Sequence, residues 1–172
     1  MPSVFQIIYM KPPRRAIPRY GQVGLTGLLA LALVAGAQAA GVTLIGNWFE
    51  MIGTDDLIMG AGTDFRPSFE TGAAGTTLEI ANTQGASWTM WVRRDSSTLP
   101  AAVSVAVRRT TEGAGTGGIS GGTDYLVLRD YEQALFQGVG DRSGIGLQLR
   151  LAGISISQGA GLHGCTLIYR IQ

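Results

Sequence analysis

The stretch Ser87–Arg93, SWTMWVR, decides the fold class of this 172-residue chain. Every second residue in it is large and apolar, and the residues between are Thr89, Trp91 and Arg93. The apolar positions are Trp88, Met90 and Val92. A period of two residues places these three side chains on one face of an extended strand and the others on the opposite face. The stretch therefore predicts a half-buried strand of an antiparallel sheet.

The same alternation recurs along the chain. It is clear in Thr76–Asn82, Ala102–Thr110, Ile145–Leu151 and His163–Ile171, and Ile154 and Ile156 extend it through Gly153–Ser157. Less regular strands are predicted at Val42–Phe49, Asp56–Met59, Arg66–Thr71 and Asp124–Leu128, and Tyr131–Gln137 fits either a strand or a helical turn. Strands at this spacing predict an all-β fold, an antiparallel β-sandwich of the immunoglobulin-like or jelly-roll-like kind.

Glycine is the most over-represented residue, with 26 of 172. It gathers between the predicted strands, where turns need a positive φ angle. The densest run, Glu112–Gly122, resembles a phosphate-binding loop only in its glycine content, because no Lys follows it as that motif requires. We expect it to be a long, flexible connection between strands.

Residues 1–39 have the features of a secretory signal peptide. A basic region, Lys11–Arg19, precedes the apolar run Leu25–Ala37 and a small-x-small cleavage site at Ala37–Ala39. The apolar run is too short for a membrane span, which needs about 20 residues. Arg14 and Arg15 lack the bulky apolar pair of a twin-arginine signal, which favours the Sec-type route. Met10 offers an alternative start.

Removal of residues 1–39 would leave residues 40–172 as a single β-sandwich domain with no membrane span. This part contains nine Arg, no Lys and twelve acidic residues, so its net charge is −3. An acidic chain argues against nucleic-acid binding, for which a basic surface is expected. We expect the mature protein to be secreted, periplasmic or at the cell surface.

No set of residues predicts catalysis, a metal or a cofactor. Cys165 and His163 share a strand face, but no third group orients them and no positive group activates the thiol, so we expect a buried structural Cys. The loop aspartates are expected to accept hydrogen bonds from backbone amides. Calcium binding at Gly53–Asp64 and a hydrolase using scattered carboxylates remain alternatives. We expect the protein not to be an enzyme.

Two arginine pairs, Arg93-Arg94 and Arg108-Arg109, end alternating strands, so one Arg of each pair is expected to point inward and to anchor the sandwich rim. The alternative interpretation is a surface that binds a sugar or a polyanion. Trp91 shares the outer face with Arg93, and exposed aromatic and Arg side chains are typical of interfaces. Trp91, Arg93 and Arg108 are therefore the candidate binding surface.

Four segments carry a resemblance to known proteins: Ser87–Asp95, Val107–Tyr125, Phe136–Ile156 and Leu162–Ile171. Across roughly residues 55–171 the chain resembles a group of small exported bacterial proteins without assigned function. The alternating end of the chain, with Leu167, Tyr169 and Ile171, also resembles immunoglobulin-like subunits of surface fibres, of the spore-coat-U and chaperone–usher pilin types. Such subunits commonly carry a disulfide, whereas this chain has one Cys.

The resemblance to fibre subunits implies strand exchange between neighbours. Val42, Leu44 and Trp48, in the apolar segment Val42–Phe49, are the candidate donor strand. The leading hypothesis is thus a non-catalytic structural or assembly subunit at the bacterial cell surface, with itself or other surface proteins as partners. The alternative is a module that binds carbohydrate or another envelope component through its aromatic and Arg surface.

Overall fold

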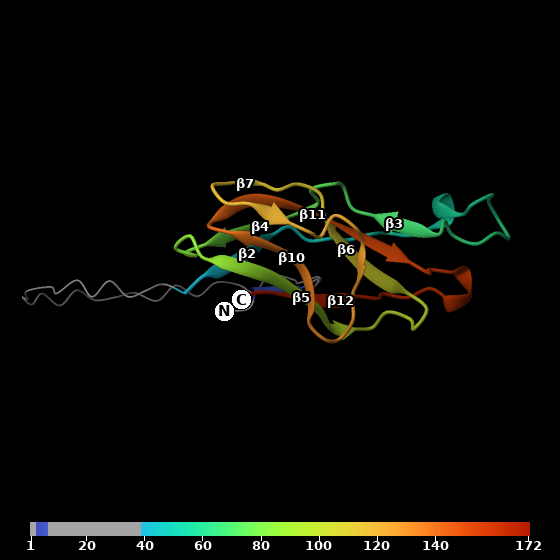
Figure 1. Ribbon diagram of the computed structural model, residues 1–172. Coiled ribbons are helices and arrows are strands. Elements are labelled where there is room, and N and C mark those ends of the chain that lie inside the picture. Colours follow the sequence, from blue (N-terminus) through green and yellow to red (C-terminus); the bar gives the residue numbers. More distant parts are fainter. Residues whose placement is uncertain (1–2, 7–38) are drawn as a thin grey trace, which may run out of the picture.

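The computed structural model describes residues 3–6 and 39–172, which form an antiparallel β-sandwich (Figure 1). Sheet A contains, in spatial order, β1 (Ser3–Gln6), β12 (Cys165–Ile171), β5 (Ser87–Ser97), β10 (Gln133–Val139) and β8 (Ile119–Ser120). Sheet B contains β2 (Gly41–Ile45), β4 (Thr76–Ala81), β11 (Arg142–Ala152), β6 (Ser104–Arg109) and β9 (Leu126–Val127). Two more strands, β3 (Ser68–Glu70) and β7 (Ala114–Gly115), also pair with β11. The predicted all-β, antiparallel β-sandwich is confirmed.

The apolar face of each alternating strand lies between the sheets. In β5, Trp88, Met90 and Val92 are 4 %, 0 % and 1 % exposed, as their alternation predicts. The opposing sheet contributes the buried side chains of Leu78, Ile80, Val107, Ile145 and Leu147, and β12, beside β5 in sheet A, contributes Leu167 and Tyr169. Each such side chain stabilises the fold by about 1.5–3 kcal/mol relative to an exposed one. Every core residue with described burial belongs to residues 39–172.

The glycine-rich run does not form the long unpaired connection expected from its composition. Ala114–Gly115 pairs with β11 of sheet B, and Ile119–Ser120 pairs with β10 of sheet A, so the run crosses from one sheet to the other. It runs alongside the connection between β10 and β11, which passes from sheet A to sheet B at the same corner. The two backbones approach so closely that a Cβ on Gly117 would lie 1.9 Å from the carbonyl oxygen of Val139. Glycine is needed here because of this contact.

Two segments differ from the predicted strands. Thr54–Asp56 forms a 3-10 turn, η1, where Asp56 accepts a hydrogen bond from the Gly53 amide at 3.0 Å, and only Leu57 makes a single bridge to Phe65. The second is the predicted extension Gly153–Ser157. Its end belongs to another 3-10 turn, η2 (Ile156–Gln158). These side chain to backbone bonds compete with the sheet ladder, and alternation of apolar residues does not reveal them.

In η2 the competing bond comes from Ser155, whose hydroxyl accepts a hydrogen bond from the Ser157 amide at 3.3 Å. Ile156 is consequently 50 % exposed instead of buried in a strand. The loops of η1 and η2 lie at the same end of the sandwich (Figure 1). Tyr131–Gln137, for which a strand and a helical turn both fitted, contributes to strand β10.

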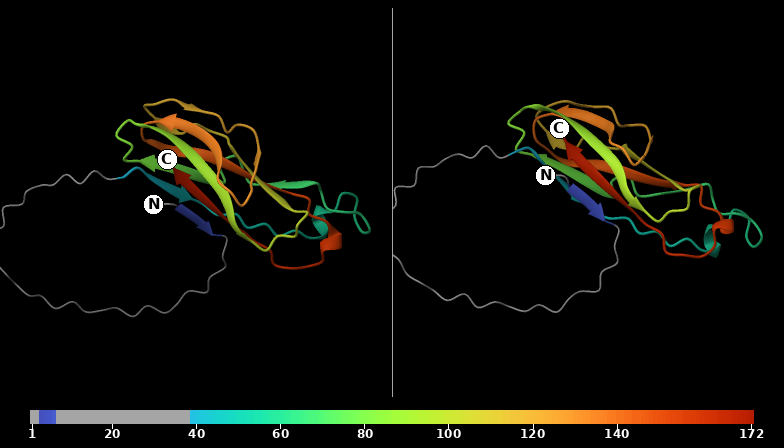
Figure 2. Two further views of the ribbon diagram at one scale, coloured as in Figure 1. Left: turned by 60° about the horizontal axis from the view of Figure 1, so that its bottom comes forward. Right: turned by 90° about the horizontal axis from the view of Figure 1, so that it is seen from below.

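The predicted signal peptide lies outside the described residues, apart from Ser3–Gln6 and Ala39. Ser3–Gln6 forms β1, which pairs with β12 and lies beside β2 at the open side of the sandwich (Figure 2). Within the described residues, no helix is long and apolar enough to cross a membrane.

Candidate functional site

The outward side chains of β5 form a row along the outer face of sheet A. Thr89, Trp91 and Arg93 alternate with the buried residues that face sheet B. Trp91 is partly exposed, with Ala134 of β10 and Arg170 of β12 as its strand neighbours. The prediction that Trp91 and Arg93 share the outer face is confirmed.

Two arginines on this face, Arg93 and Arg170, are held in ion pairs. The Arg93 guanidinium lies 2.6 Å from a carboxylate oxygen of Asp95. The Arg170 guanidinium lies 2.6 Å from Glu132 and 3.1 Å from the side-chain oxygen of Gln172. Such exposed pairs contribute about 0–1 kcal/mol each, so they add little to stability. Their effect is that the guanidinium groups of Arg93 and Arg170 each already have a carboxylate partner.

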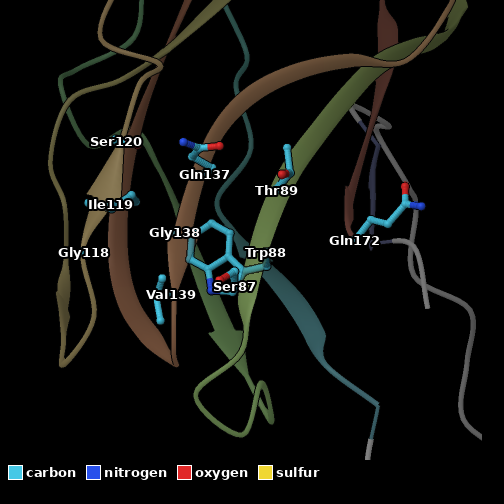
Figure 3. Close-up of a pocket in the computed structure, with 10 residues that line it drawn as sticks. All are labelled: Ser87, Trp88, Thr89, Gly118, Ile119, Ser120, Gln137, Gly138, Val139 and Gln172. Carbon is cyan, nitrogen blue, oxygen red and sulfur yellow. The ribbon is translucent and has the colours of Figure 1, made fainter.

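A groove of about 490 Å³ lies over β5, β10 and β8 at the Thr89 end of this row, and Trp91 and Arg93 are not among its lining residues (Figure 3). Its polar side chains are hydroxyls and amides, and no lining side chain carries a charge. They are Ser87, Thr89, Ser120, Gln137 and Gln172. Figure 3 shows Thr89 and Gln137 on neighbouring strands, with Gln172 on the far side of β5. Sequence reasoning missed this groove, because it depends on which strands become neighbours.

The floor of the groove is fixed by Trp88. Its indole nitrogen donates a hydrogen bond to the Gly140 carbonyl at 2.8 Å, and its ring meets Phe136 edge to face at 6.1 Å between centroids. Gly138 lies directly against the indole and contributes only backbone to the groove. One hydrogen bond and one ring contact therefore hold the indole in this position.

Arg108, the third residue of the predicted surface, is not brought together with Trp91 and Arg93. Because Val107 and Arg109 are buried, Arg108 faces outward from sheet B, on the opposite side of the sandwich. It donates two hydrogen bonds to Gln148, at 3.0 and 2.8 Å. The candidate surface thus contains Trp91 and Arg93 but not Arg108.

Arg108 instead belongs to a cluster on the outer face of sheet B, which we name the Tyr125 cluster and which consists of Glu70, Arg108, Tyr125, Gln148 and Arg150. The guanidinium carbons of Arg150 and Arg108 lie 3.6 and 4.7 Å from the centre of the Tyr125 ring. Arg150 also donates to Glu70 at 2.6 Å, and this hydrogen bond is the main reason that the pKa of Glu70 is lowered. Burial raises the pKa of Tyr125. These contacts join β3, β11, β6 and the start of β9.

The inward arginine of the second pair behaves as expected for a rim anchor. Arg109 is 7 % exposed, and its Nε donates to the Gly121 carbonyl at 2.9 Å. Its guanidinium also lies 6.0 Å from the centre of the Phe136 ring. This confirms an anchoring role for Arg109.

The candidate donor residues belong to the chain's own sandwich. Val42 is 6 % exposed and lies opposite Ile80, and Leu44 lies opposite Leu78, because β2 pairs with β4 along its length. Trp48, beyond the end of β2, is 9 % exposed and donates to Glu50 at 3.0 Å. Donation of this segment to a neighbour would require β2 to leave its own sheet.

The strand β12 has a different partner on each of its two edges. One side of β12 pairs with β5, and the other pairs with β1 through Thr166–Tyr169. Phe5 lies opposite Leu167 in this register. Within residues 39–172, no strand pairs with that second edge of β12. Its backbone amides and carbonyls are therefore available to an added strand whenever β1 is absent.

His163 and Cys165 do not form a reactive pair. His163 is exposed before the start of β12, where its Nδ1 lies 2.9 Å from the Thr98 carbonyl oxygen. Cys165 is 8 % exposed, and burial raises the pKa of its thiol. A raised pKa reduces the thiolate fraction, which is the reactive form.

The loop aspartates hold turns, as expected. Asp141 accepts hydrogen bonds from the amides of Asn82 and Thr83, and Asp64 accepts from the amides of Phe65 and Ile156. These bonds lower the pKa of both carboxyls. Within the described residues, no group of three His, Cys, Asp or Glu side chains is placed to hold a metal ion.

Comparison with protein-family models, with curated proteins and with solved structures finds no match for the chain. The fold and the site define a β-sandwich with two surface features on sheet A. One is the polar groove beside Trp91, and the other is the β12 edge that accepts a strand. Both present groups that can form hydrogen bonds, and Trp91 adds an aromatic ring beside the groove.

Proposed function

We propose that the protein is a non-catalytic subunit of an exported assembly at the bacterial cell surface, and that it contacts its neighbours by strand addition at β12. The observation that carries this proposal is the pairing of Ser3–Gln6 with Thr166–Tyr169. A segment distant in the sequence thereby extends sheet A at its edge. Backbone hydrogen bonds provide most of the affinity in this mode of recognition.

The β12 edge lacks the features that normally protect an exposed strand. Natural edge strands carry Lys, Pro or inward-pointing charges that prevent pairing with another chain. In Cys165–Ile171 the only charged residue is Arg170, which points outward and pairs with Glu132. The rest of the strand is apolar or uncharged. This composition favours an edge that binds a partner strand.

Export would expose this edge. If cleavage follows Ala39, as the sequence predicts, β1 is removed and Thr166–Tyr169 loses its partner. The mature chain would then accept an extended segment of another subunit in the same antiparallel register. Because β2 pairs with β4 of its own chain, its donation to a neighbour would break that pairing. A donor segment other than β2 leaves sheet B intact.

Peptide binding to residues 40–172 tests this proposal. This part contains the core residues described above, so we expect it to fold without β1. A synthetic peptide of residues 2–8, PSVFQII, should bind it and restore amide protection from hydrogen exchange at Thr166–Tyr169. The control is the same peptide with Pro in place of Val4 and Phe5, because Pro cannot donate to the ladder.

Sedimentation of residues 40–172 gives the second measurement. We expect association that increases with concentration and that the PSVFQII peptide suppresses by competing for the edge. A strictly monomeric protein that also fails to bind the peptide would contradict strand addition. Equal binding of the Pro-containing peptide would show that the contact is not a strand ladder.

A further inference from the structure

We infer that the groove on the outer face of sheet A binds a neutral carbohydrate chain, with Trp91 as the surface on which one sugar ring stacks. The groove lies over β5, β10 and β8, and so does not use the backbone edge of β12. This inference is therefore independent of strand addition. A protein of this kind can assemble through one part of sheet A and bind a glycan through another.

The first observation is that hydrogen-bonding groups in the groove are available. The side chains of Ser87, Thr89, Ser120 and Gln137 make no hydrogen bond to another residue in the described part of the chain. Hydroxyl and amide groups supply both donors and acceptors. A sugar hydroxyl also donates and accepts, so it can satisfy such groups where a purely donating or purely accepting ligand cannot.

The second observation concerns charge. None of the side chains that line the groove is ionisable, and the nearby Arg93 and Arg170 are already paired with Asp95 and Glu132. An acidic ligand would have to compete with these carboxylates for its cation. A neutral ligand gains the hydrogen bonds without separating an ion pair. The groove therefore favours an uncharged polyhydroxyl ligand.

The third observation is the position of Trp91. It follows Thr89 by two residues on the same face of β5, which corresponds to about 7 Å along a strand. Its neighbour on the β10 side is the small, exposed Ala134, which leaves that side of the ring approachable. Aromatic rings pack well against the apolar faces of ligands whose edges are polar. One sugar ring on Trp91 would place the next at the hydroxyls of the groove.

Binding of neutral oligosaccharides to the 172-residue chain tests this inference. The probes are short gluco-, galacto- and manno-oligosaccharides, with a uronic-acid oligosaccharide as the charged comparison. Tryptophan emission reports contact, because Trp48 and Trp88 are 9 % and 4 % exposed and leave Trp91 as the most accessible indole. We expect at least one neutral series to shift the emission and to protect Trp91 from a soluble quencher.

Three substitutions locate the site. Trp91→Ala removes the fluorescent reporter, so titration calorimetry measures all variants; this substitution should weaken binding about tenfold or more, since stacking is lost. Thr89→Val and Gln137→Ala should each weaken it about three- to tenfold, as expected for one lost hydrogen bond. Thr43→Val, an exposed Thr of β2 in sheet B, is the matched control and should leave binding unchanged.

The outcomes are distinct. Neutral-glycan binding that falls in the three groove variants and persists in Thr43→Val supports the inference, provided that the variants keep the wild-type unfolding temperature. Binding of the uronic-acid probe alone would overturn it, as would silence with every neutral series. Neutral binding that is unchanged by Thr89→Val and Gln137→Ala would also overturn it, because the ligand would then lie elsewhere.

Discussion

The backbone of Gly138 lies so close to Trp88 that a Cβ on residue 138 would stand 2.5 Å from Cζ2 of the indole. Neither group can easily move. Trp88 is 4 % exposed and bonded to the Gly140 carbonyl, and residue 138 is paired with strands on both sides. The size of residue 138 therefore determines whether the Trp can stay under the groove.

The first prediction is that Gly138→Ala destabilises the protein by about 1–3 kcal/mol, the usual cost of overpacking a core. Denaturant unfolding followed by tryptophan emission measures the change. Gly118→Ala is the matched control, because a Cβ on Gly118 meets no atom within 4 Å. Equal stability of the two variants would show that the indole has room to move.

The second prediction concerns the Tyr125 cluster. Arg150→Met and Glu70→Gln should each destabilise the protein, and a double-mutant cycle should give a coupling of about 0.5–1 kcal/mol, because both side chains are about one-third exposed. Arg129→Met is a suitable control, since the side chain of Arg129 makes no ion pair with any described residue. Zero coupling would mean that solvent screens the pair completely.

The same pair gives the third prediction, on acid. The hydrogen bond from Arg150 lowers the pKa of Glu70 below its ordinary 4.5 in the folded state. The folded state thus holds this proton less tightly than the unfolded state does. The contribution of the Glu70–Arg150 pair to the free energy of unfolding is present above pH 4.5. It is lost as the pH falls through the lowered pKa of Glu70. The stability difference between wild type and Glu70→Gln should shrink over that acidic range.

Alkaline pH gives the fourth prediction. Burial raises the pKa of Tyr169 well above its ordinary 10.0. The unfolded phenol ionises near pH 10 while the folded one stays neutral, so stability should fall above that pH, by up to about 1.4 kcal/mol for each pH unit. Tyr169→Phe should flatten this alkaline slope, measured as the unfolding midpoint in denaturant. A slope equal to that of wild type would show that other groups cause the loss.

A fifth prediction concerns Cys165, which is 8 % exposed and has a raised pKa. A soluble thiol reagent should modify the native protein at least about a hundredfold more slowly than the unfolded protein, because the reaction needs local opening. The absorbance of the released thiolate measures both rates. Fast labelling in the native state would show that the Cys165 thiol is accessible and reactive in the folded protein.

The strands that alternate strictly could be predicted from the sequence, because a period of two residues is a local property. Trp88, Met90 and Val92 reach the core as that pattern requires. The turn at Ile156–Gln158 could not be predicted in this way, since Ser155 and Gln158 supply hydrogen bonds that compete with the sheet. A local apolar pattern contains no information about such bonds.

The groove and the Tyr125 cluster depend on which strands become neighbours. Thr89 lies beside Gln137 only because β5 pairs with β10, and Arg108 lies beside Gln148 only because β6 pairs with β11. The same pairing separates Arg108 from Trp91. Strand order is a long-range property, and one chain without its sheet topology does not reveal it.

The glycine-rich corner has a mechanical consequence. The consecutive strands β7 and β8, and the consecutive strands β10 and β11, both pass from one sheet to the other there, and β8 pairs with β10 while β7 pairs with β11. Two covalent connections thus join the sheets at one corner, with Gly115 and Gly117 allowing the close contact. Under a pulling force the two layers cannot slide past one another at this corner without first breaking both ladders. We therefore expect the two sheets to resist a pulling force together rather than to separate one after the other.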